Sequence, residues 1–245
     1  MGYKNEIVPL ILVSNDCYWL PYTLKSIENL FDRYVIYDVG SQDGTQNIID
    51  WFIDRNRNRA SFYTRFTPML PPDIQGIFRN SMIAEAQSEW YFIVDGDEVY
   101  HPKQIHAYFS QLKLQEQYKD DRIYGVCRRI EVSNDLTQQY DIERGHHRLY
   151  HRIAIWKGTH PGEEPVIQQK ERREFNINLR CFHFHNTLRS THEDLVPKRQ
   201  KRKSQRSYHP GKLIKFNLLE QLPILQKPIE NFPVTPALKK LQDAS

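Results

Sequence analysis

The sequence predicts an α/β fold in which a mostly parallel sheet is covered by helices on both faces. Its first hundred residues alternate strand-like and helix-like segments joined by short connections, which is typical of such folds. The strand-like segments are nearly continuous apolar runs, as expected for strands that are buried on both faces. At 245 residues the chain is long enough for one large domain of this kind.

The elements of the first half follow from their residue patterns. Apolar runs rich in β-branched and aromatic residues predict strands at 7–13, 34–38, 61–67 and 90–94. Apolar residues at helical spacing predict a helix at 20–31, with Pro21 in its first turn. Asp43, Gly44 and Thr45 supply the turn and the cap of a second helix at 45–52. We expect a loop at 71–76 and a third helix at 78–86.

The second half has a more mixed pattern. We expect a helix from 102 to about 115, strands at 122–132, 147–155 and 176–184, and a highly charged helix at 191–207. Beyond residue 210, prolines recur too often for any long helix. We therefore divide the chain into a main domain at 1–207, with halves at 1–100 and 101–207, and an extension at 208–245. Apolar residues remain frequent in this extension, so we expect it to pack on the domain or on a second subunit of a homo-oligomer.

The positive charge of the chain is local. The formal net charge is +4, from 34 basic and 30 acidic residues. Eight of the basic residues and no acidic one lie between positions 198 and 215, so the rest of the chain is net negative. An anionic partner would meet the positive charge in this segment.

Membrane and secretion signals are not evident in the sequence. No apolar run approaches the roughly 20 residues that span a bilayer, and residues 7–13 look like a first strand and not like part of a leader. Cys17, Cys127 and Cys181 are odd in number and far apart, which suits neither a disulfide framework nor a cysteine metal site. We expect a cytoplasmic protein without a transmembrane segment.

The most informative segment is residues 90–98, which read Trp-Tyr-Phe-Ile-Val-Asp-Gly-Asp-Glu. An apolar strand here ends in three carboxylates, and burying such charge is costly unless a cation or hydrogen-bond donors meet it. Gly96 allows a tight turn, so Asp95 and Asp97 can reach toward one point. Their hard oxygen ligands suit a divalent cation that bridges the phosphates of a substrate.

Two other polar segments follow strands in the same way, at 14–16 and 38–45. Ligands of parallel α/β sheets bind beyond the carboxyl ends of the strands. We therefore expect all three segments to lie along one edge of the sheet.

Four motifs in order carry a resemblance to a known family. They are Ser14-Asn15-Asp16, the loop at 38–45 (Asp-Val-Gly-Ser-Gln-Asp-Gly-Thr), Arg79-Asn80, and the strand at 90–98. This order resembles the nucleotide-sugar-binding half of family 2 glycosyltransferases, which have the GT-A fold, a Rossmann-like α/β/α sandwich. Looser similarities continue at 148–150, at 156–160 and at 183–185.

The resemblance implies a nucleobase pocket at the first two strand ends. Asp38 would border this pocket, and Val39 replaces a second aspartate that many members carry. Asn15 and Asp16 would shape its floor, and Ser14 would contact the base or the ribose.

The same resemblance implies the residues that hold the rest of the donor. Arg79 would approach the nucleotide, and Asp95 would contact the ribose or the sugar. Asp97 would ligate the cation that bridges the two phosphates. His183 or His185 would complete the metal shell, and we name His185 first; the alternation of strand residues places both on one face.

We therefore expect a metal-dependent, inverting glycosyltransferase. Its donor would be a nucleoside-diphosphate sugar, in our expectation a UDP-sugar, and its acceptor a hydroxyl of a carbohydrate or glycoconjugate. A shell of carboxylate, phosphate and imidazole suits Mn²⁺ at least as well as Mg²⁺.

The catalytic base must deprotonate the acceptor, and a carboxylate is the usual choice at neutral pH. We place it at Glu163 or Glu164, on a proline-flanked turn beside Trp156, whose face would stack on a sugar. Asp141 is the reserve candidate.

Two other functions fit parts of the sequence. A nucleotidylyltransferase has a similar α/β sheet, but the segment after the first strand, at 14–19, lacks the glycines and basic residues expected there. A nucleic-acid-binding protein would use the basic run at 198–206 for phosphate contacts, but no recognised nucleic-acid motif accompanies that run, so nucleic acid is an unlikely partner.

Overall fold

The computed structural model describes residues 7–68, 75–112, 123–141, 144–151, 154–157, 164–166, 173–192, 212–229 and 231–244. The predicted helix at 191–207, the basic run at 198–206 and most of the predicted loop at 71–76 lie outside these residues. No helix of the described residues combines the length and the apolar character needed to cross a bilayer.

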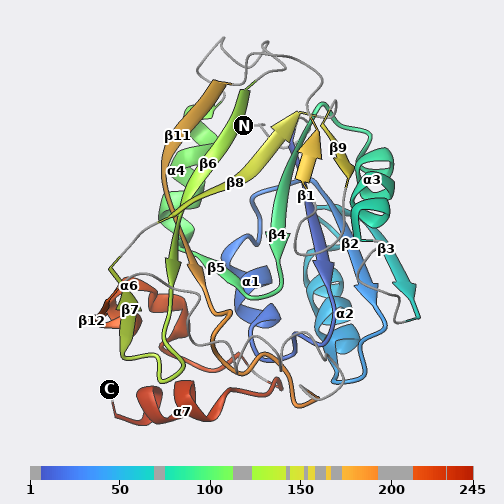
Figure 1. Ribbon diagram of the computed structural model, residues 1–245. Helices are drawn as coiled ribbons and strands as arrows, with labels where there is room; N and C mark the ends of the chain where they lie inside the picture. Colours follow the sequence, from blue (N-terminus) through green and yellow to red (C-terminus); the bar gives the residue numbers. More distant parts are fainter. Residues whose placement is uncertain are drawn as a thin grey trace.

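An eight-stranded sheet forms the centre of the protein, in the order β3-β2-β1-β4-β8-β6-β11-β5 (Figure 1). The strands β1, β2, β3 and β4 are parallel to their neighbours within this group. Beyond β4 the pairing is mixed, because β8 is antiparallel to both of its neighbours while β6 and β11 are parallel. The eight strands are β1 (Ile7–Val13), β2 (Arg33–Val39), β3 (Ser61–Thr67), β4 (Trp90–Asp95), β5 (Glu98–Tyr100), β6 (Ile123–Glu131), β8 (Arg144–His151) and β11 (Arg173–His183).

Alternate residues of the sheet bury two separate cores, one on each face. Ile11, Ile36 and Phe92 belong to a cluster with helices α1 (Leu20–Ser26), α2 (Thr45–Asn56) and α4 (Pro102–Leu112). Leu10 and Tyr91 belong to a cluster with α3 (Gln75–Ala86) on the other face. The sheet therefore has apolar side chains on both faces, and the predicted α/β/α arrangement is confirmed.

The first four strands agree closely with the sequence, whereas the helices differ in length. Strands β1 and β3 have the predicted bounds, and β2 and β4 are longer by one residue at one or both ends. Helix α1 ends at Ser26, and the chain turns through Asn29, which has a left-handed φ of 63°. Helical spacing of Leu30 and Phe31 thus reflects their burial in the core and not a continued helix.

Several short strands of the second half had no clear sequence signal. The predicted strand at 147–155 is two elements, because β8 ends at His151 and a separate strand β9 (Ile155–Lys157) pairs with β10 (Glu164–Val166). Strand β7 (Gln138–Tyr140) pairs with β12 (Leu213–Lys215), which follows the basic run. These pairings join segments that are distant in sequence, and strands of three residues carry too short a pattern to predict.

The C-terminal residues form a third core with the segment that follows β1. Helix α6 (Leu218–Gln221), the 3-10 helix η5 (Pro223–Leu225) and α7 (Pro236–Asp243) are short, as the prolines require. Leu222, Leu225 and Leu238 are buried against a stacked pair, Trp19 and Phe184, whose ring centroids are 3.7 Å apart. Figure 1 shows α7 below the sheet and α6 beside β7 and β12. The division of the chain near residue 207 stays a prediction.

Candidate functional site at the carboxyl edge of the sheet

The segments that follow β1 and β2 are joined by hydrogen bonds. The backbone nitrogen of Asn15 donates to Ser41 Oγ at 2.7 Å, and that of Asp16 donates to Thr45 Oγ1 at 3.0 Å. Asn15 has a φ of 52°, a region that asparagine tolerates, and its Oδ1 accepts a hydrogen bond from the Gln42 backbone nitrogen. The predicted convergence of 14–16 and 38–45 on one edge is therefore confirmed.

One carboxylate oxygen of Asp38 accepts hydrogen bonds within the described part of the protein, and the other does not. Its Oδ1 accepts hydrogen bonds from the backbone nitrogen of Ser41 at 3.1 Å and from Ser41 Oγ at 2.5 Å. Its Oδ2 is buried, and no described residue donates a hydrogen bond to it. Burial raises the pKa of Asp38 to about 6, although the hydrogen bonds from Ser41 lower it. A ligand donor at Oδ2 would satisfy this oxygen.

Glycine is needed at position 96 because the Asp16 side chain lies close to its Cα, and not because the backbone turn there requires glycine. Its φ does not lie in the left-handed region, so a tight turn is not the reason for glycine, contrary to the expectation from the sequence. A Cβ at this position would lie 2.7 Å from Asp16 Oδ2 and 2.9 Å from Asp16 Cγ. The carboxylate of Asp16 thus occupies the space that a side chain at 96 would need.

The two aspartates of the Asp-Gly-Asp motif have different partners. Asp95 Oδ1 lies 2.7 Å from Arg79 Nη2, and Asp95 Oδ2 lies 2.7 Å from Arg148 Nη2. Arg148 also pairs with the fully buried Glu98. Burial raises the pKa of Asp95, but the two guanidinium groups outweigh this effect and hold it well below its ordinary value. Asp95 therefore stays ionised at the edge of the site, where its side chain is 30 % exposed.

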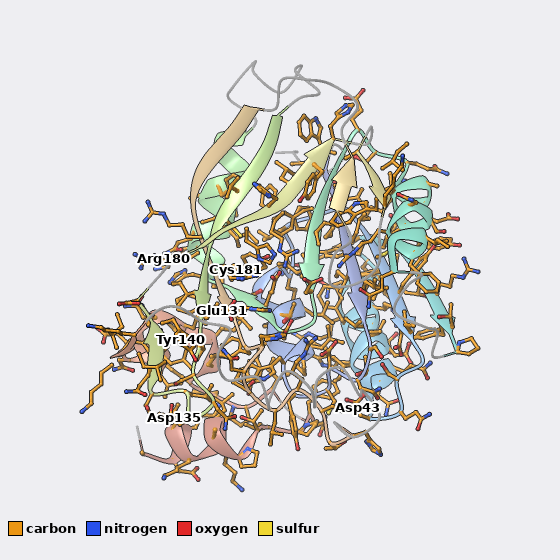
Figure 2. The ribbon with its side chains drawn as sticks, viewed as in Figure 1. Asp43, Glu131, Asp135, Tyr140, Arg180 and Cys181 are labelled. Atoms are coloured by element: carbon orange, nitrogen blue, oxygen red, sulfur yellow. The ribbon has the colours of Figure 1, made fainter. Side chains whose placement is uncertain are left out.

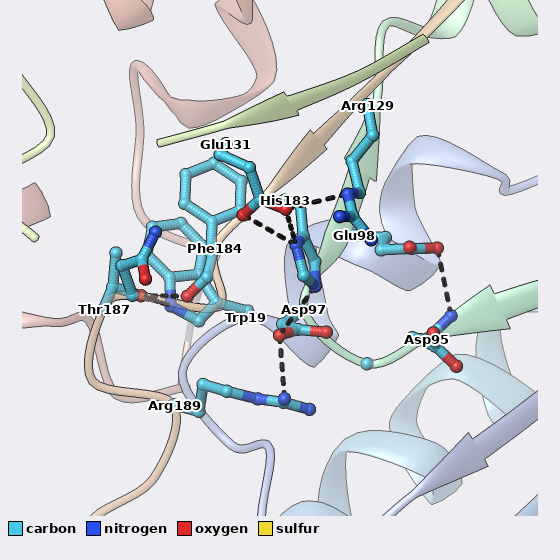
Figure 3. A network of polar contacts seen from close by, with 12 residues as sticks. Trp19, Asp95, Asp97, Glu98, Arg129, Glu131, His183, Phe184, Thr187 and Arg189 are labelled. Carbon is cyan, nitrogen blue, oxygen red and sulfur yellow. Dashed lines mark hydrogen bonds and ion pairs between the residues drawn. The ribbon is translucent and has the colours of Figure 1, made fainter. Parts of the chain in front are cut away.

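Asp97 lies at the centre of a second cluster, drawn in Figure 3. Its Oδ2 atom is 2.8 Å from Arg189 Nη1 and 3.5 Å from His183 Nε2. One ligand atom each from Asp97, His183 and His185 lie within 4.8 Å of one another. The rings of the two histidines are stacked, with centroids 5.2 Å apart. The three predicted metal ligands are therefore brought together, from the end of β4 and the end of β11.

Glu131, at the end of β6, supports His183 from behind. Its two carboxylate oxygens each lie 3.0 Å from His183 Nδ1, and Arg129 pairs with it at 2.7 Å. Figure 2 labels Glu131 and Figure 3 shows how its carboxylate faces the imidazole. A carboxylate on Nδ1 leaves Nε2 directed toward Asp97, which is the usual arrangement of a metal-binding histidine.

The charges of this cluster keep Asp97 ionised. Burial raises its pKa, but Arg189 and the two imidazoles outweigh burial and hold the pKa below its ordinary value. For Glu131 burial has the same effect, and His183 and Arg129 outweigh it and lower the pKa to about 2. The site is therefore a set of ionised carboxylates balanced by arginine and histidine.

The cluster fits a divalent cation. Although Arg189 Nη1 is near, no described residue makes a well-directed hydrogen bond to the buried Oδ2 of Asp97. One carboxylate and two imidazoles at this spacing suit Mn²⁺ better than Mg²⁺, because imidazole nitrogen is a softer ligand than oxygen.

Three charged residues of the site were not named as site residues from the sequence. Arg148 lies in the segment 148–150, which contributed only to the looser family resemblance. Glu131 ends a predicted strand, and its role depends on the pairing of β6 with β11. Arg189 has no sequence signal apart from its place shortly after the two histidines.

The structure gives less support to the predicted acceptor loop. Glu163 lies outside the described residues, and Glu164 is described only as the first residue of β10, with its side chain outside them. Trp156 is only 9 % exposed. The guanidinium carbon of Arg79 lies over the Trp156 ring, 5.7 Å from the ring centroid, so that face of the ring is not free for a sugar. The reserve candidate Asp141 is exposed and accepts a hydrogen bond from the Lys212 backbone.

Comparison with known families gives one match. The model of Glycosyl transferase family 2 matches residues 10–195. This range covers three quarters of the chain and includes every site residue from Ser14 to Arg189. No curated protein matches the chain.

The chain is similar in fold to solved structures of low sequence identity, including those of GalNAc-T7 and TarS. GalNAc-T7 with UDP, GalNAc and Mn²⁺ is 10 % identical, with a TM-score of 0.50 over 76 % of this chain and 44 % of that chain. TarS 1-349 of S. aureus is 16 % identical, with a TM-score of 0.43 over 60 % of this chain and 47 % of that chain. The chain thus spans less than half the length of either. The predicted GT-A type of fold is confirmed.

Substitution of Gly96 tests the close approach of Asp16. We expect Gly96→Ala to lower the free energy of unfolding by about 1–3 kcal/mol, because the added methyl group overlaps the Asp16 carboxyl. The measurement is urea unfolding of the single variants and of Gly96→Ala combined with Asp16→Ala. The cost of Gly96→Ala should shrink in the Asp16→Ala background, and an equal cost in both backgrounds would contradict the contact.

Asp38 provides a test by pH. Its pKa in the folded protein, about 6, is above its ordinary value of 3.8, so folding disfavours its ionised form. Its contribution to stability is therefore full below pH 4 and is lost as the pH rises through 6. Relative to Asp38→Asn, the wild type should lose about 2 kcal/mol between pH 4 and pH 7.

Urea unfolding of both proteins at several pH values measures this difference. The two proteins share every other titrating group, so the difference isolates Asp38. A difference that stays constant from pH 4 to pH 8 would show that the Asp38 carboxyl is not held in an environment that raises its pKa.

Proposed function

The chain belongs to glycosyl transferase family 2, and we propose that it transfers a sugar from a nucleoside-diphosphate sugar to an acceptor hydroxyl in a metal-dependent, inverting reaction. The observation that carries this proposal is the cluster of Asp97, His183 and His185, which lies beside Asp95 at the carboxyl edge of the sheet. Diphosphate-bound donors need both a cation and a nucleotide pocket, and the two candidate regions are adjacent here.

The nucleotide pocket is proposed at Asp38 and the 14–16 segment. Asp38 Oδ2, which accepts no hydrogen bond from the described residues, would accept one from a base nitrogen, and the N3–H of uracil is such a donor. Asn15 and Ser14 fix the shape of this pocket through hydrogen bonds to the neighbouring loop, including Ser14 Oγ to the Val39 carbonyl at 2.9 Å. These features favour a UDP-sugar as the donor.

Asp95 is proposed to hold the ribose or the transferred sugar. Arg79 and Arg148 each hold one of its oxygens, and its side chain remains partly exposed. A carboxylate held in this way is preorganised to accept hydrogen bonds from sugar hydroxyls.

The metal is proposed to be Mn²⁺, held by Asp97 and by His183 or His185. When bound, it would supply a Lewis acid that neutralises the charge of the departing diphosphate. Glu131 would keep Nε2 of His183 directed at the site through its contacts with Nδ1. Asp97 stays ionised because of its basic neighbours, so it is ready to act as a ligand.

An inverting reaction needs one base on the acceptor side and no protein nucleophile. We propose Glu163 or Glu164 for this role; Glu164 is the first residue of β10, and Glu163 precedes it in the sequence. Strand β9 carries Trp156, whose backbone exchanges two hydrogen bonds with the Asn80 side chain, next to Arg79. Strand β9, which pairs with β10, is therefore tied to the helix that carries the donor-side arginine.

Ligand-dependent thermal stability tests the proposed function directly. We expect UDP with Mn²⁺ to raise the melting temperature, because a ligand at about 100 times its Kd stabilises a protein by about 2.7 kcal/mol. The panel contains UDP, GDP, CDP and ADP, each with and without Mn²⁺, followed by UDP-sugars. Asp97→Asn should lose the part of the shift that depends on Mn²⁺, because its side chain is no longer an anionic ligand.

Asp54→Asn is the matched control, since Asp54 is exposed and pairs only loosely with Arg57, at 3.8 Å. It should respond like the wild type. A full Mn²⁺-dependent shift in Asp97→Asn would place the metal elsewhere, and no response to any nucleotide would contradict the proposed donor class.

A further inference from the structure

The segment that follows β11 is anchored on both sides of Arg189. The backbone carbonyl of Leu188 accepts a hydrogen bond from Trp19 Nε1 at 2.9 Å, and the carbonyl of Arg189 accepts one from the Tyr18 backbone at 3.0 Å. Ser190 Oγ donates to Asp43 Oδ2 at 2.5 Å. The Arg189 backbone is thus held against the segment after β1, and its side chain reaches Asp16 and Asp97.

The guanidinium of Arg189 bridges two buried carboxylates. Its Nε and Nη2 atoms lie 2.7 and 2.6 Å from Asp16 Oδ1, while its Nη1 atom lies 2.8 Å from Asp97 Oδ2. Both carboxylate side chains are 1 % exposed, and that of Arg189 is 14 % exposed. Figure 3 shows the guanidinium directed at the Asp97 carboxylate from the side opposite to His183.

The oxygen of Asp97 that contacts Arg189 is also the oxygen nearest to His183 Nε2, at 3.5 Å. Arg189 and a metal ion held by Asp97 and His183 would therefore meet at one atom. Two cations cannot both approach this oxygen closely without repulsion.

We propose that Arg189 is a donor-binding residue that competes with the divalent metal for Asp97 and passes from this carboxylate to the diphosphate when metal and nucleotide bind together. The inference rests on the proposed function, since it needs the metal and the diphosphate at this site. In the protein without ligands, Arg189 neutralises Asp97 in place of the metal. With both ligands present, the metal takes Asp97, and Nη1 is free to donate to a phosphate oxygen.

Arginine suits this exchange because its donors form a fork. The contacts from Nε and Nη2 to Asp16 can persist while Nη1 changes partner, so the side chain does not have to leave the site. Phosphate oxygens are strong acceptors for such a group.

The charges of the site make the two ligands cooperative. Metal alone would be opposed by Arg189, and diphosphate alone would be opposed by Asp95, Asp97 and Asp16. Bound together, they balance each other, and each must raise the affinity of the other by the same factor. Arg189 therefore sets how weakly the metal binds without nucleotide.

Mn²⁺ binding measured by the electron paramagnetic resonance signal of free Mn²⁺ tests this inference without any assay of activity. The proteins are the wild type, Arg189→Gln and the control Arg57→Gln, each titrated with and without UDP. Without UDP, Arg189→Gln should bind Mn²⁺ about tenfold more tightly than the wild type, and UDP should increase its Mn²⁺ affinity by a smaller factor. Arg57 is exposed and follows directly after the last residue of α2, so Arg57→Gln should match the wild type.

Equal or weaker Mn²⁺ binding by Arg189→Gln without UDP overturns the competition, even where the wild type binds Mn²⁺ with UDP as the proposed function requires. Absence of Mn²⁺ binding by every protein, with and without UDP, overturns the metal centre and the inference together. Should Arg189→Gln fail to fold, Arg189→Lys keeps the charge but cannot span both carboxylates. A severalfold gain in Mn²⁺ affinity for Arg189→Lys supports the competition, and no gain overturns it.

Discussion

The burial of carboxylates at the carboxyl edge of the sheet is the constraint on which the rest of this site depends. Asp16, Asp97, Glu98 and Glu131 are at most 2 % exposed, and each lies against an arginine, a histidine or both. Removing one partner of a buried ion pair costs about 3–5 kcal/mol, because the remaining charge stays buried without compensation. The arginines therefore hold a cluster of buried negative charge in place at this edge. The same pairs explain why segments from β1, β4, β6, β8 and the chain after β11 meet at one place.

Packing contacts around this edge of the sheet hold the charged side chains in position. Asp16 lies against Gly96, so the ends of β1 and β4 approach more closely than any other residue at 96 would allow. Trp19 stacks on Phe184 and is covered by the C-terminal helices, which ties the segment carrying Arg189 to the start of α1. Asp16, Asp97 and Arg189 thus belong to one connected set of contacts at this edge.

Local patterns predicted the first half of the fold because its strands are parallel, buried and separated by helices. Strands β1 and β3, the convergence of the first two polar segments, and the placing of His183 and His185 together all followed from strand alternation and strand ends. The charge partners did not, since Arg148, Glu131 and Arg189 reach the site through long-range pairing that no local pattern encodes. Helix α1 ended early because Asn29 adopts a left-handed conformation while Leu30 and Phe31 remain in the core. The sequence predicted a turn at Gly96, which the structure has, but the close approach of the Asp16 carboxyl to Gly96 had no sequence signal.

The central claim is that Asp97 exchanges Arg189 for a metal ion when the donor nucleotide binds. A crystal structure with UDP and Mn²⁺, with anomalous data collected at the manganese edge, tests it most directly. The account predicts an anomalous peak within about 2–2.5 Å of an Asp97 oxygen and of an imidazole nitrogen of His183 or His185. It also predicts that Arg189 Nη1 lies on a phosphate oxygen. An intact pair between Arg189 and Asp97, with UDP and manganese bound elsewhere, would contradict the account.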